Sequence, residues 1–110
     1  MCPQKILTPA YLWGYIIRMK ITFDAKKRQV TLDERGLDFA DADFVFDGLT
    51  LTVEDARKAY GERRFQTVGF LEGRMVMIVW TPRQEGRHVI SMRKCNAKEQ
   101  KIYRQRFEKG

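Results

Sequence analysis

The sequence predicts an α+β domain in which an antiparallel four-stranded sheet packs with two N-terminal helices and a basic C-terminal helix. Hydrophobic residues recur at helical spacing between Ala25 and Gly48, alternate from Leu49 to Lys94, and return to helical spacing after Asn96. The connections between the alternating segments are short, which favours an antiparallel meander packed on helices. A chain of 110 residues with 44% hydrophobic residues has room for one domain with one modest core.

The first eighteen residues are expected to stand apart from this domain. The stretch Tyr11–Ile17 is apolar enough to imitate a targeting segment. However, it contains Trp13 and Gly14, runs into Arg18 without a small-residue cleavage site, and is far shorter than a bilayer span. We interpret residues 1–18 as an N-terminal extension without an independent fold. The extension either results from an upstream start codon or lies on the domain as a loose strand. Residues 19–110 are interpreted as the single domain.

Two helices are predicted in the first half of the domain. Asp24 is a good N-cap, and the segment Ala25–Arg35 is a helix that ends at Gly36. Asp38 begins a second, shorter helix, which Gly48 ends. The apolar face of this second helix consists of Phe39, Ala42, Val45 and Phe46.

Four alternating segments then predict the sheet. They are Leu49–Glu54, Arg63–Leu71, Arg74–Trp80 and Arg87–Lys94. The first has its apolar residues on one side and is expected to be a half-buried strand. Glu72-Gly73 joins the second and third segments as a tight hairpin, Thr81-Pro82 ends the third, and a turn at Glu85-Gly86 precedes the fourth. A shorter apolar alternation, Ile21 and Phe23, precedes the first helix.

The positive charge of the chain is concentrated at its C-terminal end. Arg93–Lys109 holds seven cationic side chains against two carboxylates, whereas Gly36–Ala56 holds six acids and no Lys or Arg; the net charge of the whole chain is +7. Asn96 and Glu99 have the spacing of a capping box, so most of these cations lie on a helix. A concentrated basic element on a small domain indicates a polyanionic partner, and nucleic acid is the commonest one.

The usual catalytic and cofactor motifs are absent from the sequence. It contains no GxxxxGK[ST], GxSxG, HExxH or CxxC, and His88 has no second His or Cys with which to hold a metal. We interpret His88 as a packed or surface residue, and Cys2 and Cys95 as free thiols of a cytoplasmic protein. No cofactor or metal is predicted, so any chemistry must use Arg, Lys, Glu and Tyr.

Cleavage of RNA by internal transfer suits this set of residues. The ribose 2′-hydroxyl attacks the adjacent phosphorus, so the enzyme supplies neither a nucleophile nor a metal. Its tasks are to hold the backbone in line, to spread cationic donors over the phosphorane, and to assist proton movement. Arg and Lys perform the first two tasks, and a carboxylate, a tyrosine hydroxyl or a Lys of lowered pKa performs the third.

Three blocks of the chain, within residues Lys20 to Glu108, resemble the BrnT toxins of bacterial type II toxin–antitoxin systems, which share the fold of the RelE-like ribonuclease toxins. The blocks are FDAKKRQVTLDERGLDFADADFVFD from Phe23, TVEDAR with GERRFQTVG from Thr52, and ISMRKCNAKEQKIY from Ile90. The chain departs from the family at two polar positions, with Arg35 where His is common and Thr31 where Asn is common. Arg35 can bind phosphate but is a poor base, because guanidinium stays protonated.

The resemblance implies a metal-independent endoribonuclease that halts translation in the cytoplasm. It further implies a cognate BrnA-like antitoxin that covers the toxin. Because that antitoxin carries its own DNA-binding domain, contact with operator DNA occurs only through it, and no membrane partner is implied.

Nine residues are candidate site residues. The catalytic candidates are Arg64, Arg93, Lys94, Glu62 and Tyr103, and the RNA-binding candidates are Lys27, Arg35, Lys98 and Lys101. Strand alternation puts Arg93 and Lys94 on opposite faces, and we favour Arg93 as the phosphate clamp, with Arg64 as the second transition-state donor.

Each candidate also has a structural interpretation. Arg93 could form a surface ion pair with Glu62 or Glu99, Arg64 could be a solvated charge at a strand edge, and Tyr103 could belong to the core. Glu62 is a candidate base or an ordinary surface acid, and so is Glu54.

Two other functions remain open at this point. The basic helix suits a non-enzymatic nucleic-acid-binding module, although the chain has no helix-turn-helix, zinc-finger or RNP-type signature. A protein-interaction domain whose basic face meets an acidic partner is the other.

Overall fold

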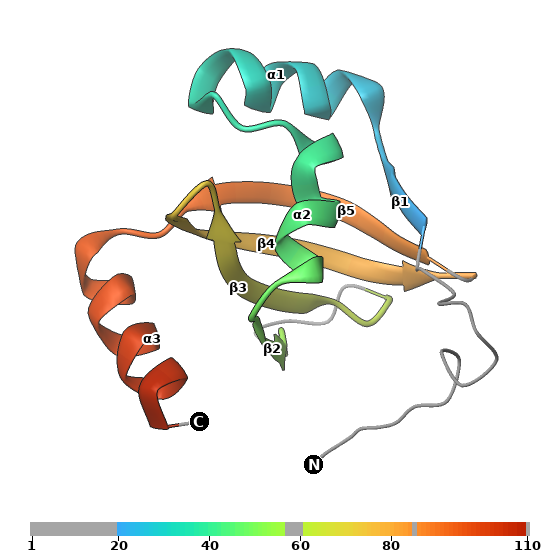
Figure 1. Ribbon diagram of the computed structural model, residues 1–110. Coiled ribbons are helices and arrows are strands. Elements are labelled where there is room, and N and C mark those ends of the chain that lie inside the picture. The colour runs from blue at the N-terminus through green and yellow to red at the C-terminus, as the bar shows by residue number, and fades with distance from the viewer. Residues whose placement is uncertain (1–19, 57–60, 85, 110) are drawn as a thin grey trace, which may run out of the picture.

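The computed structural model describes residues 20–56, 61–84 and 86–109, so the predicted extension over residues 1–18 and Glu85 of the predicted turn lie outside the described residues. These described residues form a five-stranded mixed sheet with three α-helices and one short 3₁₀ helix (Figure 1). The elements are β1 (Lys20–Phe23), α1 (Ala25–Arg35), η2 (Phe39–Asp41), α2 (Ala42–Asp47), β2 (Leu51–Glu54), β3 (Phe65–Leu71), β4 (Arg74–Arg83), β5 (Gly86–Lys94) and α3 (Ala97–Lys109). The strand order is β1-β5-β4-β3-β2. The α+β class is therefore confirmed.

The prediction of four antiparallel strands was wrong by one strand. β1 joins the sheet beside β5 in parallel, with Ile21 opposite Arg87 and Phe23 opposite Val89. A four-residue segment has no hairpin partner to reveal it, and its partner lies 66 residues further along the chain. Gly86 makes the pairing possible, since a Cβ there would lie 2.5 Å from the Lys20 carbonyl oxygen. The other strand pairs are antiparallel, as predicted.

The helices of the first half begin and end where the caps predict. The Asp24 side chain accepts from the Lys27 amide at 2.9 Å, and Gly36 closes α1 in the left-handed conformation with φ of 69°. The second predicted helix is confirmed as a 3₁₀ turn, η2, that continues into α2. Asp38 caps η2 by accepting from the Ala40 amide.

The main hydrophobic core lies between η2, α2 and one face of the sheet. Its buried members are Leu37, Phe39, Ala42, Val45, Val76, Ile78, Trp80, Val89 and Met92. A second, smaller cluster lies under α3 on the other face and consists of Val68, Met75, Met77 and Cys95, with Phe70, Tyr103 and Phe107 packed against it. Each face of the sheet is therefore covered by helix, but α3 covers only the end of its face that carries Met75 and Met77.

Two further details of the strands differ from the prediction. β2 begins at Leu51 and not at Leu49, which is 66% exposed, and it is not half-buried, because Val53 is 46% exposed. β4 does not end at Thr81-Pro82 but continues to Arg83, with Pro82 opposite Arg87. Phe65, the first residue of β3, lies opposite Trp80, so Pro82 lies on a part of β4 that pairs with β5 alone and needs no donor on its other side.

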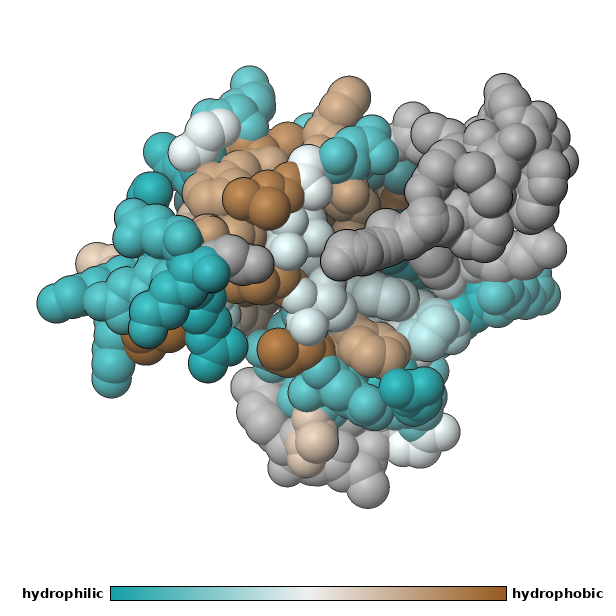
Figure 2. Space-filling view, turned by 60° about the horizontal axis from the view of Figure 1, so that its bottom comes forward, coloured by the Kyte–Doolittle hydropathy of each residue, from teal (hydrophilic) through white to brown (hydrophobic). Residues whose placement is uncertain are grey.

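Figure 2 shows the molecule from the side that lies at the bottom of Figure 1. Hydrophilic residues crowd the left of this view, where α3 lies, and apolar patches separate them from the middle. Of the described residues, none belongs to a helix long and apolar enough to cross a membrane.

Candidate functional site

The sheet face turned away from η2 and α2 is partly uncovered. Gln66, Val79 and Ser91 lie side by side across β3, β4 and β5 there, and none of them is buried. We call this surface, which also includes His88 and Arg93, the open face. Alternation along the strands directs these side chains away from the main core.

Four polar side chains meet at the end of the open face where β4 ends and β5 begins. Glu62 forms ion pairs with Arg64, at 3.5 Å between Oε2 and Nη2, and with Arg83, at 3.7 Å between Oε1 and Nη2. His88 lies opposite Thr81 on the neighbouring strand and senses the charges of Arg83 and Glu62. We call Glu62, Arg64, Arg83 and His88 the polar cluster.

His88 is held in position by the edge strand β1. Its Nδ1 lies 2.9 Å from the Thr22 hydroxyl, which comes from the residue opposite it on β1. Partial burial, and then the charge of Arg83, lower the pKa of His88 below its ordinary 6.5, although Glu62 acts in the opposite direction. The imidazole is therefore mostly neutral at pH 7, and the tautomer that donates from Nδ1 to Thr22 leaves Nε2 free to accept a proton.

Arg93 lies on the open face, at the end where α3 begins. Its two Nη atoms donate to the two carboxylate oxygens of Glu99 at 2.8 and 2.7 Å. Glu99 and Asn96 also form the predicted capping box, each side chain accepting from the other's backbone amide. The guanidinium bonds hold the pKa of Glu99 at about 2. Tyr103 packs partly buried against the cluster under α3.

The structure groups the catalytic candidates into two sets. Glu62 and Arg64 lie together in the polar cluster, whereas Arg93 contacts Glu99 and lies near Tyr103. Arg93 is opposite Met77, and Arg64 precedes Phe65, which is opposite Trp80. Arg64 and Arg93 thus share a face but are separated by about four residues along β4, roughly 13 Å, and by two strand spacings.

The remaining candidates lie elsewhere on the surface. Lys94 is opposite Val76 and projects from the other face of the sheet, as alternation predicts. Lys27 and Arg35 both line a pocket of about 390 Å³ between α1 and β5, where Arg35 donates to the Met92 carbonyl at 3.0 Å. Lys98 and Lys101 are exposed on α3.

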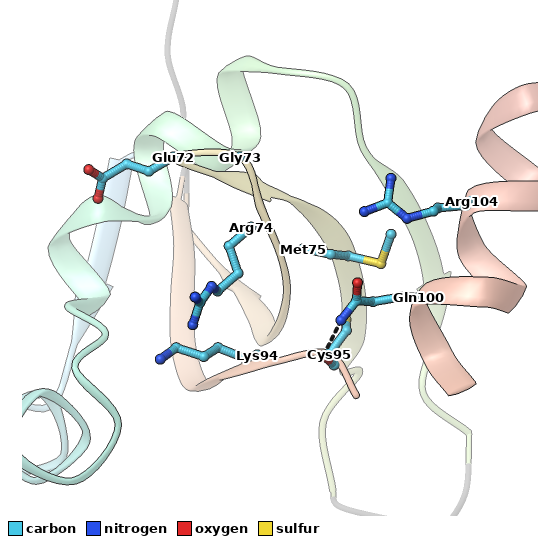
Figure 3. Close-up of a pocket in the computed structure, with 8 residues that line it drawn as sticks. All are labelled: Glu72, Gly73, Arg74, Met75, Lys94, Cys95, Gln100 and Arg104. Atoms are coloured by element: carbon cyan, nitrogen blue, oxygen red, sulfur yellow. Dashed lines mark hydrogen bonds between the residues drawn. The ribbon is translucent and has the colours of Figure 1, made fainter. Parts of the chain in front are cut away.

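Another pocket, of about 480 Å³, opens between the β3–β4 hairpin, the end of β5 and α3 (Figure 3). Its lining consists of Glu72, Gly73, Arg74, Met75, Lys94, Cys95, Gln100 and Arg104. Burial raises the pKa of the Cys95 thiol, which keeps it protonated and unreactive.

Comparison with protein families gives a match over most of the domain. A family model described as the ribonuclease toxin BrnT of type II toxin–antitoxin systems matches residues 23–99. The chain belongs to this family. No curated protein matches the chain.

The BrnT match covers most of the elements around the open face, from the end of β1 to the first turn of α3. It includes both residues at which the chain departs from the familiar family pattern, Thr31 and Arg35. The charged side chain of Arg35 is fixed at the end of α1 by its bond to the Met92 carbonyl. Asn96 completes the capping box by accepting from the Glu99 amide at 2.8 Å.

Arg83 and His88 belong to the polar cluster but are missing from the candidates derived from the sequence. A single histidine on a strand carries no local signal of function, and Arg83 follows a proline that was expected to end its strand. Only the pairing of β4 with β5 brings the two together with Glu62. Among the described residues, no group of three His, Cys, Asp or Glu side chains is arranged to hold a metal ion.

Proposed function

We propose that this BrnT-family chain is a metal-independent endoribonuclease whose catalytic centre is the polar cluster on the open face. The observation that carries the proposal is the grouping of two guanidinium groups, a carboxylate and a neutral imidazole at the end of the sheet that α3 does not cover. This set supplies both the cationic donors and the proton acceptor that internal transfer requires.

The reaction divides its tasks among these residues. His88 Nε2 takes the proton of the ribose 2′-hydroxyl, the 2′-oxygen forms a bond to phosphorus, and the bond from phosphorus to the 5′-oxygen breaks. The 5′-oxygen takes a proton from water, so the products end in a 2′,3′-cyclic phosphate and a 5′-hydroxyl. Arg64 and Arg83 stabilise the charge on the phosphorane, and Glu62 orients both guanidinium groups.

The remaining candidates serve RNA binding in this proposal. Arg93 and Tyr103 lie further along the open face, and Lys94 follows Arg93 at the end of β5. Their role is to hold nucleotides away from the cut, because Arg93 is already paired with Glu99 and lies too far from Arg64 to share its phosphate. Lys27, Arg35, Lys98 and Lys101 extend the positive field around the molecule.

Membership of the BrnT family supports the biological setting of the proposal. The toxin halts translation in the cytoplasm by cutting RNA, and a cognate BrnA-like antitoxin neutralises it by covering the open face. Operator DNA is contacted only through that antitoxin.

Incubating the purified chain with RNA in EDTA tests the proposed reaction. Discrete fragments with 2′,3′-cyclic phosphate and 5′-hydroxyl ends are expected, and the same RNA with methylated 2′-hydroxyls should remain intact. Fragments with 5′-phosphate ends, or cleavage only after a divalent metal is added, would contradict it. RNA that is retarded on a gel but never cut would instead indicate the non-enzymatic binding module.

A further inference from the structure

The pocket beside the β3–β4 hairpin gathers three cations from three different elements. Arg74 comes from the start of β4, Lys94 from the end of β5 and Arg104 from the second turn of α3. Lys94 is opposite Val76, and Arg74 lies two residues away on the same side of β4, a diagonal separation of about 7–8 Å between Cα atoms. In Figure 3 the side chains of Arg74 and Lys94 extend to one side of the pocket, away from Arg104, which points toward Met75 from α3.

These three cations lack the carboxylate partners that five described arginines have, namely Arg28, Arg63, Arg64, Arg83 and Arg93. None of Arg74, Lys94 and Arg104 forms an ion pair with any described residue. The single carboxylate in the lining, Glu72, points away from Arg74 and Lys94 (Figure 3). Like charges held together without a counterion repel one another, and a bound anion removes that repulsion.

The chemistry of the lining suits a phosphate group. Arginine forks donate two parallel hydrogen bonds to phosphate oxygens, and lysine adds a point charge. Gln100 is fixed in the wall by donating from Nε2 to the Cys95 carbonyl at 3.1 Å, which leaves its own carbonyl oxygen as an acceptor in a largely cationic site. A volume of about 480 Å³ accommodates one nucleotide but not a protein helix.

We propose that this pocket is a phosphodiester subsite that holds the RNA chain away from the cut. The inference rests on the ribonuclease proposed above, because both sites lie along β5: the polar cluster flanks its first residues and Lys94 ends it. An RNA chain that follows β5 past Arg93 therefore reaches the pocket. There Arg104, on one side, and Arg74 with Lys94, on the other, bind phosphates several nucleotides from the cleaved one.

The test measures binding with RNA that the protein cannot cut. Fluorescence anisotropy of a labelled 2′-O-methyl decanucleotide gives the affinity of the full chain and of an Arg74→Gln, Arg104→Gln variant. The variant should bind the decanucleotide more weakly, by up to about tenfold. Its affinity should also depend less steeply on salt, because fewer phosphates are neutralised. A trinucleotide, too short to reach from the polar cluster to the pocket, should bind both proteins alike.

An Arg106→Gln, Lys109→Gln variant is the matched control. Arg106 lies two residues after Arg104, about 200° around the helix, and Lys109 is the last residue of α3. Neither lines the pocket, so their loss lowers the net charge by the same two units without touching it. Thermal unfolding by circular dichroism verifies that the variants fold; both arginines of the pocket are exposed, so their unfolding temperatures should match that of the unaltered chain.

Three results would overturn the subsite. Equal decanucleotide affinity in the pocket variant and the Arg106→Gln, Lys109→Gln control is the first. Loss of antitoxin binding with unchanged RNA binding would assign the pocket to a protein partner, and a mononucleotide that binds as tightly as the decanucleotide would assign it to a free nucleotide. Because 2′-O-methyl RNA is never cleaved, the result is independent of whether the chain proves to be a ribonuclease.

Discussion

The two ends of β5 carry opposite arrangements of charge. At its first residues, Arg64 and Arg83 are each paired with Glu62 beside a neutral His88, whereas at its last residue Lys94 joins two arginines that have no carboxylate partner among the described residues. Paired cations are already oriented and change little when substrate arrives, which suits stabilisation of a transition state. Unpaired cations gain most from a bound anion, which suits affinity. We therefore assign catalysis to the first end of β5 and RNA binding to its last end.

Removing Arg64 should have the largest effect and tests whether the first end of β5 is catalytic. Arg64→Ala should reduce kcat for RNA cleavage by about 100-fold to 1000-fold, the usual cost of one transition-state donor. Single-turnover cleavage of a labelled RNA measures the effect. Arg63→Ala is the control, because Arg63 is the neighbouring arginine but pairs with Glu54 on the surface. Equal losses in the two variants would remove Arg64 from the catalytic centre.

Changing His88 tests the proton transfer at the same end. His88→Gln should lower kcat by roughly 100-fold, the lower range for a lost general base. Because the base acts in its deprotonated form and the pKa of His88 lies below its ordinary 6.5, activity of the unaltered chain should fall as the pH drops through that lowered pKa. The His88→Gln variant should lose this acidic limb of the pH–rate profile. An unchanged profile would contradict the assignment.

Changing Lys94 tests whether the last end of β5 binds RNA without taking part in catalysis. Lys94→Gln should raise KM for a long RNA on the order of tenfold, the contribution of one charged hydrogen bond, and leave kcat nearly unchanged. Steady-state kinetics over a range of RNA concentrations separates the two constants. A fall in kcat with constant KM would return Lys94 to the catalytic centre and remove the distinction between the two ends.

The smallest expected effect concerns Arg93 and Glu99, between the two ends. The folded-state pKa of Glu99 is about 2, below its ordinary 4.5, so its stabilisation is present above pH 4.5 and is lost as the pH falls toward 2. Glu99→Gln should reduce the free energy of unfolding by about 1 kcal/mol at pH 7, discounted for the partial exposure of the pair, and the difference should shrink toward pH 2. Denaturant unfolding measures it.

Glu108→Gln, on the exposed last turn of the same helix, is the control for that experiment and should not change the free energy of unfolding measurably. If Glu99→Gln matches this control at every pH, Arg93 is available for phosphate and the earlier interpretation of Arg93 as the clamp gains support.

Local signals in the sequence predicted the features that neighbouring residues decide. The caps at Asp24 and Gly36 bound α1, the pair Asn96 and Glu99 begins α3, and Glu72-Gly73 forms the hairpin, with φ of 51° and 78°. In each case the interacting groups lie within four residues of one another, so spacing and residue type are sufficient. The opposite facing of Arg93 and Lys94 follows from strand alternation in the same way.

The tertiary structure decided what depends on distant pairing. The parallel contact of β1 with β5 joins residues 66 positions apart, and the ion pair of Glu62 with Arg83 joins residues 21 positions apart. The continuation of β4 past Pro82, and the approach of Arg83 to His88, depend on the pairing of β4 with β5. Tertiary structure likewise brings Arg74, Lys94 and Arg104 together around their pocket. The sequence alone therefore identified a basic α+β domain and its helix ends, whereas the register between strands determined which charges meet, because a shift of one residue in register turns every side chain to the opposite face.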